Sequence, residues 1–311
     1  MIDLDDFLAS MNTFAIGGTV VAASPISHGD GTLGTTTTVR RMRVVQPDGS
    51  VQDVPIVSGN GVRGRLRRVS GEMLWREASR PRLSAAQHAQ LLRDPQSQSE
   101  HLLTSGEFRT IYQGGSLTKA QKRMASTQVT RIRELLPHMS LFGWSGGGRI
   151  VEGRSKVSAL IPLCDETAHI LDATVAGSFW ERLDVMEFSR MEDTIRSTRA
   201  NQIAVGLGEN LDDDTDQMRF ATQVIAAGTP MAWAIKAEDA TSLEAAWVRV
   251  LLTRWALDDA TVGGRSAAGL GKLKLDGLTG DWRASQDDAD MIGDHFSSNK
   301  DEIQEAITWL G

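Results

Sequence analysis

The sequence has few of the residues that mark several classes of protein. Its 311 residues include one cysteine, Cys164, which excludes an internal disulfide framework and zinc sites built from cysteine pairs. We expect Cys164 to be a small buried residue within "ALIPLC". No apolar run approaches the roughly 20 residues of a membrane-spanning helix. The acidic start "MIDLDDF" lacks the basic region of a secretory signal, so a cytoplasmic protein without a membrane partner is expected.

Motifs of the common hydrolases are also missing. The sequence has no HExxH and no GxSxG, and its acidic run "DDDTD" at 212–216 is typical of a solvated loop. "HGDG" places His28 two residues from Asp30, a pair that could act as acid and base or bind a metal, but no third member is obvious. The sequence therefore predicts no cofactor, no metal and no catalytic residue. An enzyme that uses His28 and Asp30 is the open alternative.

What is present is a globular composition with an uneven distribution of charge. Apolar residues make up 41% of the chain and charged residues 23%, as in ordinary globular domains. Residues 1–156 hold 20 Lys and Arg against 13 Asp and Glu, a net +7, whereas residues 157–311 hold 13 against 27, a net −14. This split favours one polyanion-binding face and one solvated or partner-facing surface. Alternatively, the sequence halves are not spatial halves.

The first quarter of the chain predicts strands followed by a helix. Residues 18–26 are β-rich, 27–38 read as a loop, and 39–59 read as two strands joined by a "PDG" turn. Apolar residues then recur at the spacing of a helix: Val62, Leu66, Val69, Met73 and Leu74.

The rest of the chain alternates insertions with further strands and helices. Residues 77–140 are polar and basic with helical pieces that end at Pro137, and they look like an insertion. Two strands about a "GTP" turn are expected at 220–235, and 242–257 predict an amphipathic helix. A second Gly/Arg loop, "GGRSAAGLGKLKL", then runs into a strand. This order predicts an α+β fold with a ferredoxin-like domain of the RNA-recognition kind.

The stretch "SGNGVRGRLRR" concentrates glycine and arginine at the start of the predicted helix. Ser58 or Asn60 supplies an N-cap, which leaves the first free amides of the helix as an anion site. Arg63 and Arg67 lie one turn apart and away from the apolar stripe, so both can reach one stretch of phosphate backbone. Gly64 costs about 1 kcal/mol relative to alanine, which suits the close approach of a ligand. A capped helix with a solvated basic face is equally open.

Two further segments combine arginine with features of nucleic-acid sites. The late loop contains Gly264, Arg265 and Gly269, whose backbone can form an anion-binding turn or an ordinary one. In "RMEDTIRSTR" an apolar wedge is flanked by cations, as in an arm that splays bases and grips the backbone. A surface hairpin whose arginines pair with neighbouring carboxylates is the alternative. The arm residues of interest are Arg190, Met191, Arg196 and Arg199.

Four motifs together carry a resemblance that no single one carries. "PISHGDGTLG", "VPIVSGNGVRGRLRR", "LFG" at 141–143 and "GGRSAAGLGKLKL" follow one another with characteristic spacing over residues 15–276. In this the chain resembles the repeat-associated RNA-binding (RAMP) superfamily of CRISPR systems, and within it the Cas-seven-like backbone subunit. Chain length, the "RMEDTIRSTRANQ" segment and "FGWSGGG" make it most similar to the backbone subunit of type IV effector complexes.

The resemblance implies a hand-shaped fold. It predicts a ferredoxin-like palm at 12–76 and 141–276, a helical fingers insertion at 77–140, a β-hairpin thumb at 187–222 and an acidic C-terminal tail at 277–311.

The resemblance also implies which residues bind guide RNA, or crRNA. The helix after the first glycine stretch grips guide phosphates, the thumb reaches over RNA held by a neighbouring copy, and the late glycine loop shapes the palm beside it. These roles carry over to Ser58, Asn60, Arg63 and Arg67; to Arg190, Met191, Arg196 and Arg199; and to Gly264, Arg265 and Gly269.

The family's partners and one departure from its pattern complete the prediction. Copies are expected to form a helical filament on crRNA with a Cas-five-like subunit and a large or small subunit, presenting the guide for pairing to target DNA or RNA. In type III relatives an aspartate after the first strand cuts target RNA, but here the equivalent run, Thr35–Thr38, has no acid. The resemblance thus implies a non-catalytic scaffold. The alternatives are a metal-dependent ribonuclease that uses His28 and Asp30, and a ferredoxin-like oligomer outside CRISPR whose arginines only form salt bridges.

Overall fold

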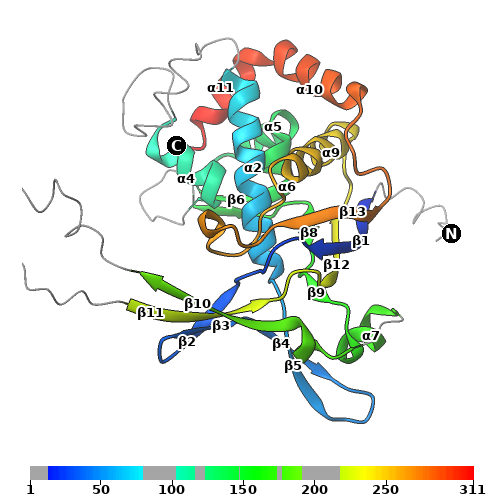
Figure 1. The fold of residues 1–311 in the computed structure, drawn as a ribbon. Coiled ribbons are helices and arrows are strands. Elements are labelled where there is room, and N and C mark those ends of the chain that lie inside the picture. Colours follow the sequence, from blue (N-terminus) through cyan, green and yellow to red (C-terminus); the bar gives the residue numbers. More distant parts are fainter. Residues whose placement is uncertain (1–12, 80–102, 116–122, 147, 174–176, 191–217) are drawn as a thin grey trace, which may run out of the picture.

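The structure is a computed structural model with a mixed α+β fold, as the sequence predicts. Helices cover one face of a central sheet, two smaller sheets lie on its other side, and a short third one lies beside the helices (Figure 1). No helix among the described residues is long and apolar enough to cross a membrane. The described residues are 13–79, 103–115, 123–146, 148–173, 177–190 and 218–311.

The central sheet is antiparallel and brings together strands from both ends of the chain. Its order is β13 (Leu273–Thr279), β1 (Phe14–Ala22), β12 (Pro230–Ala237) and β8 (Ser155–Val157), and β9 (Ile161–Pro162) also pairs with β12. Because β1 lies between two strands of the acidic second half, the charge split along the sequence does not divide the molecule into two spatial halves.

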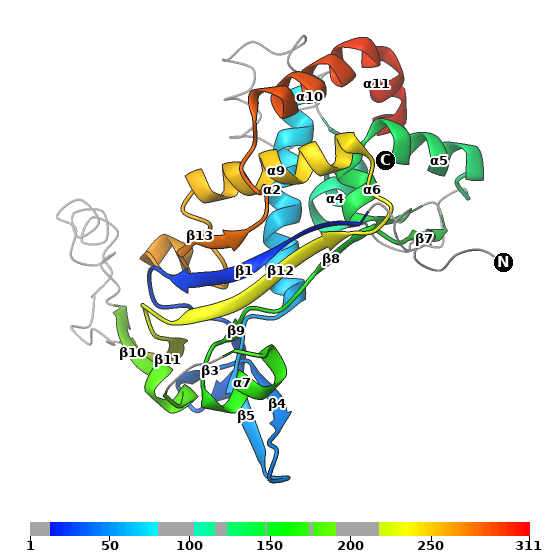
Figure 2. The same ribbon diagram turned by 90° about the vertical axis from the view of Figure 1, so that its right-hand side faces the viewer.

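Two helices pack on one face of this sheet (Figure 2). In α2 (Gly59–Ser79) all five residues of the predicted apolar stripe are buried, which confirms the predicted helix. The second helix, α9 (Ser242–Leu257), has the predicted bounds, and its Trp247 and Trp255 are buried against the sheet and the neighbouring helices. Burial of these large apolar side chains is the main force that holds the layers together.

A group of shorter helices surrounds the upper end of α2. The helix α5 (Ser126–Leu135) ends just before Pro137, as expected, and Pro137 then begins α6 (Pro137–Phe142), since proline suits the first position of a helix. The others are α4 (Ser105–Gln113), α10 (Gln286–Ser298) and α11 (Lys300–Thr308).

A buried hydrogen-bond network joins four of these helices. His138 Nε2 donates to the Ile111 carbonyl oxygen at 3.0 Å, so its Nδ1 accepts from Ser70 Oγ at 2.8 Å. Ser70 Oγ in turn accepts from Trp247 Nε1 at 2.8 Å. Burial, together with the charge of Arg67, lowers the pKa of His138 to about 3, so the ring is neutral in this network.

The lower part of the molecule corrects two expectations. Residues 27–38, expected as a loop, contain the antiparallel ribbon β2 (Gly29–Leu33) and β3 (Thr36–Val39), which turns at Gly34 with φ of 61°. The strands on either side of the "GTP" turn exist, but they do not pair. Instead, β11 (Met218–Ile225) pairs with β10 (Leu183–Arg190) and β3, whereas β12 joins the central sheet.

The remaining elements form small ribbons and turns. The predicted hairpin with a "PDG" turn is confirmed as β4 (Arg41–Val45) and β5 (Val51–Pro55). Beside it Cys164 is buried, as expected, in a small separate core with Val44, Val54 and Phe179. The other elements are β6 (Trp144–Gly146), β7 (Arg149–Val151), α7 (Asp165–Leu171) and the 3-10 turns η1 (Phe179–Arg182) and η3 (Ser266–Ala268).

Candidate nucleic-acid interface

The four motifs that are far apart in the sequence touch one another in the structure. The Gly264 amide of the late loop donates to the Ser27 carbonyl oxygen at 2.7 Å. The next residue, His28, lies with Nε2 3.0 Å from Ser58 Oγ at the start of α2. Further along α2, Arg63 donates to the Phe142 carbonyl oxygen of the "LFG" motif at 2.8 Å. The motifs therefore form one continuous line of contacts.

Ser58 caps the N-terminus of α2. Its Oγ accepts a hydrogen bond from the Gly61 amide at 3.2 Å, so of the two predicted caps it is Ser58 that serves, and Asn60 is exposed. The His28 ring packs on Gly61, where a Cβ would lie 2.9 Å from its Cε1 atom. Burial and the nearby Arg40 charge lower the pKa of His28. The first turn of α2 has no acidic residue, so the positive end of the helix dipole is not neutralised there.

Arg63 and Arg67 lie side by side at the C-terminal end of α6. Arg67 Nη2 donates to the Gly143 carbonyl oxygen at 2.8 Å and also to that of Phe142. Both guanidinium groups lie near the Phe142 ring, at 6.0 Å for Arg63 and 5.7 Å for Arg67. The last carbonyls of a helix have no partner within the helix, and two cations placed there stabilise its negative end.

The two arginines differ in how much of each remains accessible. Arg67 is only 7% exposed, and burial followed by the charge of Arg63 lowers its pKa to about 10, so it stays charged at neutral pH. Arg63 is half-buried and keeps guanidinium N–H groups beyond the one that Phe142 accepts. The phosphate contacts expected of both stay predictions, but Arg67 also anchors α6, which the sequence did not suggest.

The outer face of α2 next to Arg63 is open. A Cβ built on Gly64 would meet no atom within 4 Å, and Arg68 is exposed on the same side as Asn60. Within the described part of the chain, none of Arg63, Arg67 and Arg68 forms an ion pair with a carboxylate. The charge of Glu152 acts on Arg63, so this stretch of helix combines positive charge that is only partly compensated with room for an approaching chain.

The late loop contacts both Ser27 and the hairpin β10–β11. Gly263 has φ of 72°, and a Cβ there would lie 2.2 Å from the Ser27 carbonyl oxygen, so glycine is required. The guanidinium of Arg265 lies over the rings of Phe188 on β10 and Phe220 on β11, at 4.8 Å and 4.6 Å from their centroids. Sequence reasoning missed both phenylalanines. They lie on the two strands that flank the polar stretch of sequence at 191–217. Gly269 ends η3 at an exposed position.

The predicted arm residues are described only where they meet the hairpin. Arg190 is the last residue of β10, and its backbone pairs with that of Met218. Met191, Arg196 and Arg199 lie outside the described residues.

The pair His28 and Asp30 is not held together as an acid and base. Asp30 Oδ1 forms an ion pair with Arg40 at 2.5 Å, whereas His28 faces Ser58. Across the described residues, no group of three or more His, Cys, Asp and Glu side chains is arranged to hold a metal ion.

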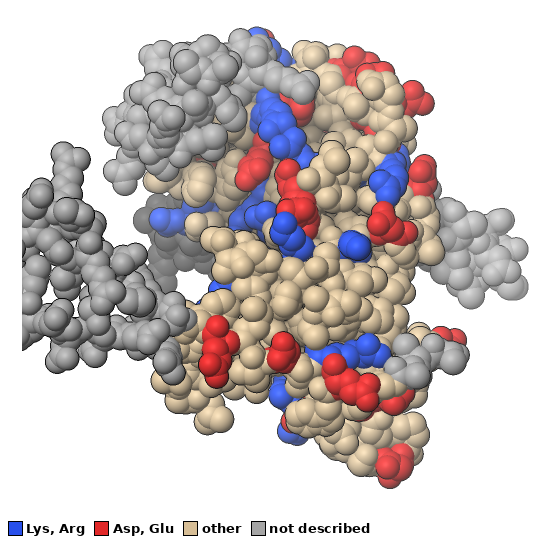
Figure 3. Space-filling model, viewed as in Figure 1, with Lys and Arg blue, Asp and Glu red and all other residues tan. Residues whose placement is uncertain are grey.

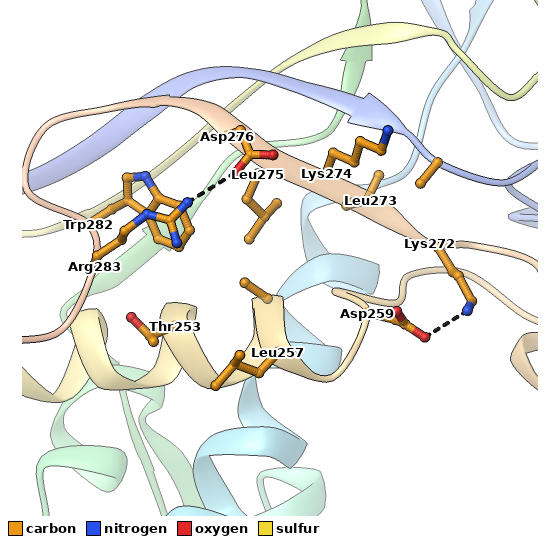
Figure 4. Close-up of a pocket in the computed structure, with 12 residues that line it drawn as sticks. Thr253, Leu257, Asp259, Lys272, Leu273, Lys274, Leu275, Asp276, Trp282 and Arg283 are labelled. Atoms are coloured by element: carbon orange, nitrogen blue, oxygen red, sulfur yellow. Dashed lines mark hydrogen bonds and ion pairs between the residues drawn. The ribbon is translucent and has the colours of Figure 1, made fainter.

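Charge elsewhere on the molecule is mixed. In Figure 3, Lys and Arg lie among Asp and Glu over the helical upper part, so neither sign covers that face. A cavity of about 370 Å³ lies between α9 and β13, and its charged lining includes two ion pairs (Figure 4). These are Lys272 with Asp259 at 2.7 Å and Arg283 with Asp276 at 3.0 Å.

The fold is similar to that of a chain in a solved CRISPR complex. A chain in the structure of a type IV-B CRISPR complex superposes with a TM-score of 0.53 and 24% sequence identity, over 86% of this chain and 90% of that one. The crystal structure of Thermofilum pendens Csc2 gives a TM-score of 0.39 and 14% identity, over 98% of this chain and 80% of that one. No family model and no curated protein matches the sequence. The expected resemblance to a protein of a type IV CRISPR complex is confirmed at the level of the fold.

Proposed function

We propose that this chain is a non-catalytic backbone subunit of a CRISPR effector complex, which binds guide RNA through its phosphates and assembles as a helical filament. The observation that carries the proposal is the line of contacts from the late loop through Ser27, His28 and Ser58 to Arg63 and "LFG". These contacts join residues that are spread over more than 230 positions of the sequence, and the line ends at the arginine-rich start of α2. The fold shared with a chain of a type IV-B CRISPR complex supports it.

We infer a ferredoxin-like palm with added fingers and thumb. The sheet order β13-β1-β12-β8, with α2 between β1 and β8 and α9 between β12 and β13 along the chain, is the order expected of a split βαβ fold. The helices α4 and α5 would belong to the fingers insertion at 77–140. The hairpin β10–β11 would be the base of the thumb at 187–222, and α10 and α11 would form the acidic C-terminal tail at 277–311.

The chemistry proposed for the palm is a sequence-independent grip. Arg63 and the exposed Arg68 would contact phosphates, the open surface at Gly64 would let the RNA backbone approach, and the capped end of α2 would add its dipole. Contacts of this kind carry no sequence information, so specificity would come from pairing between the guide and its target. The remaining predicted contacts, at Asn60, Arg67, Gly264, Gly269 and the arm, belong to the same proposal.

Partners would follow from the same assembly. Further copies of the chain, a Cas-five-like subunit and a large or small subunit would complete the complex. We place the acidic second half of the chain on surfaces that face neighbouring subunits or solvent, where it would limit promiscuous coating of RNA.

Salt-dependent binding of single-stranded RNA tests the proposed grip. Replacing Arg63 and Arg68 with glutamine removes two charges and should lower the slope of log affinity against log salt by about 1.4, since each phosphate contact on a single strand contributes about 0.7. Arg131→Gln is the matched control, because Arg131 lies on α5 and is already engaged by Glu134 and Glu302. An unchanged slope in the double variant, or an equal fall in the control, would contradict the grip.

A cleavage assay tests the non-catalytic part of the proposal. The purified filament is incubated with complementary RNA and a divalent metal, and intact RNA is expected. Cleavage that Asp30→Ala abolishes would instead support the metal-dependent ribonuclease.

A further inference from the structure

Arg265 makes an unusual contact between the late loop and the outer part of the hairpin β10–β11. Its guanidinium lies over two aromatic rings at once, 4.8 Å from the centroid of Phe188 and 4.6 Å from that of Phe220. The rings are cross-strand partners, stacked with centroids 5.5 Å apart and planes inclined by 12°. Figure 1 shows the orange loop that precedes β13 lying directly above this hairpin.

The contact lies where the hairpin leaves the body of the molecule. Nearer the root, Thr222, Val224 and Ile225 of β11 are fully buried. Beyond them the strands are partly or fully exposed, and the nearest sheet neighbour is β3, which pairs with Ala221 and Thr222. Phe188 and Phe220 are therefore the last described side-chain pair of the hairpin that the body touches.

The backbone of the late loop holds Arg265 in place for this contact. Arg265 itself has φ of 60°, a left-handed conformation that is uncommon for a residue with a side chain. The loop is fixed on both sides, because the Gly264 amide donates to Ser27 at 2.7 Å and the Gly271 amide donates to Pro25 at 2.8 Å. An unfavourable backbone conformation that is held by its surroundings often marks a functional position.

The Arg265 guanidinium contacts aromatic rings and no carboxylate among the described residues. Among the described residues, the Arg265 side chain makes no hydrogen bond or ion pair, and its contacts of note are the two rings. A guanidinium is weakly hydrated and attracts the negative face of an aromatic ring, more strongly as water is excluded. Its N–H groups have no hydrogen-bond partner among the described residues, so the contact with the rings does not use them.

We propose that Arg265 is a positioning residue that fixes the direction in which the hairpin β10–β11 leaves the palm. This role differs from the direct RNA contact expected from the sequence, and it acts through Phe188 and Phe220. The contact of Arg265 with Phe188 and Phe220, called the clamp below, does not depend on the proposed function. Its use in directing a thumb toward RNA rests on that proposal.

Hydrogen exchange of the full chain without RNA tests the clamp. Arg265→Gln keeps a side chain of similar reach and removes the charge. Amide exchange in residues 183–190 and 218–225 should rise about 2- to 30-fold, the range that loss of one cation–π contact allows, while exchange in β1 and β12 stays unchanged. Arg265→Lys keeps a cation but loses the planar, weakly hydrated guanidinium, so its exchange should lie between those of the wild type and Arg265→Gln.

Arg283→Gln is the matched control, because Arg283 also lies over an aromatic ring, Trp282, at 4.3 Å, but not at the hairpin. It should leave exchange in the hairpin unchanged. The clamp is overturned if Arg265→Gln leaves the hairpin protected or if exchange rises equally in the central sheet. Phe188→Leu also loses its stacking on Phe220, but it should raise exchange less in Arg265→Gln than in the wild-type protein, and equal rises in the two backgrounds would also overturn the clamp.

A distance measurement tests the orienting role directly. Nitroxide labels at Glu187→Cys on β10 and Asp301→Cys on α11 should give one narrow distance, which broadens when Arg265→Gln is added. An equally narrow distribution in both proteins would contradict the orienting role. Because neither experiment contains RNA, both outcomes are independent of whether the chain binds a guide.

Discussion

Protonation of His138 should make the fold sensitive to mild acid. The ring is fully buried between α2, α4, α6 and α9, where Nε2 donates to Ile111 and Nδ1 accepts from Ser70. In the folded protein its pKa is lowered to about 3, first by burial and then by the charge of Arg67. In the unfolded chain the pKa returns to about 6.5.

The sign and size of the effect follow from this difference. Between about pH 3 and pH 6.5 the unfolded chain binds one more proton than the folded protein, so the free energy of unfolding falls as the pH is lowered. Integrating between these two pKa values gives a loss of about 2 kcal/mol on going from about pH 7 to about pH 5. This contribution to stability is fully present above pH 6.5, the approximate pKa of His138 in the unfolded chain, and is lost as the pH falls toward about 3, its pKa in the folded protein.

Urea unfolding followed by tryptophan fluorescence measures this loss, and Trp247 lies in the network itself. His138→Gln removes the titrating ring and should lose about 2 kcal/mol less than the wild-type protein over the same pH interval, whatever its stability at pH 7. Ile292→Val on α10 is the matched control, because it disturbs buried packing without removing a titrating group, and its pH dependence should equal that of the wild type. The reasoning is refuted if the wild type and His138→Gln lose equal stability.

Other substitutions test the packing around the site. Asp288 forms a largely buried, bidentate ion pair with Arg249 of α9, which lowers the pKa of Asp288 to about 2. Asp288→Asn breaks this pair and should lower the free energy of unfolding by about 3 kcal/mol, measured by thermal unfolding. Arg67→Met should lower the free energy of unfolding by about 2 kcal/mol through loss of its bonds to two carbonyls, and an unchanged Tm would contradict the anchoring role. Gly143→Ala should be more damaging than either, since φ is 60° and a Cβ would lie 2.3 Å from a carbonyl oxygen, and expression of folded protein is the readout. Gly64→Ala should stabilise the fold by up to about 1 kcal/mol and, under the proposed function, weaken RNA binding; stronger binding would argue against RNA approach at that position.

Elements with a strong apolar pattern were predictable from the sequence. The apolar stripe from Val62 to Leu74 predicted α2. The amphipathic pattern of 242–257 predicted α9, and the turn residues "PDG" predicted the hairpin. The ribbon β2–β3 was missed because β2 is exposed throughout and carries no alternation of apolar and polar residues. α10 was missed because Ile292 and Phe296 are its few buried apolar residues among acidic ones.

The site shows a similar division between local and tertiary information. Its motifs were visible in the sequence, including the Ser58 cap, which needs only the next three residues. The burial of Arg67 could not be predicted from the sequence, because it depends on contacts with the end of α6, some 75 positions away. The contact of Arg265 with Phe188 and Phe220 likewise exists only once the late loop has been fixed by Ser27.

The short turn between β11 and β12 makes the hairpin and the central sheet mechanically continuous. Only residues 226–229 separate the two strands, and they are tied down: the Gly228 amide donates to Ala22 at 2.7 Å, and the Ala226 amide donates to Arg182 at 2.8 Å. A force applied to the hairpin would therefore pass directly into β12 beside β1, without a slack linker to absorb it. In a polymer of such subunits, bending the filament at one hairpin would strain the sheet of the subunit that bears it, which would make the filament stiff.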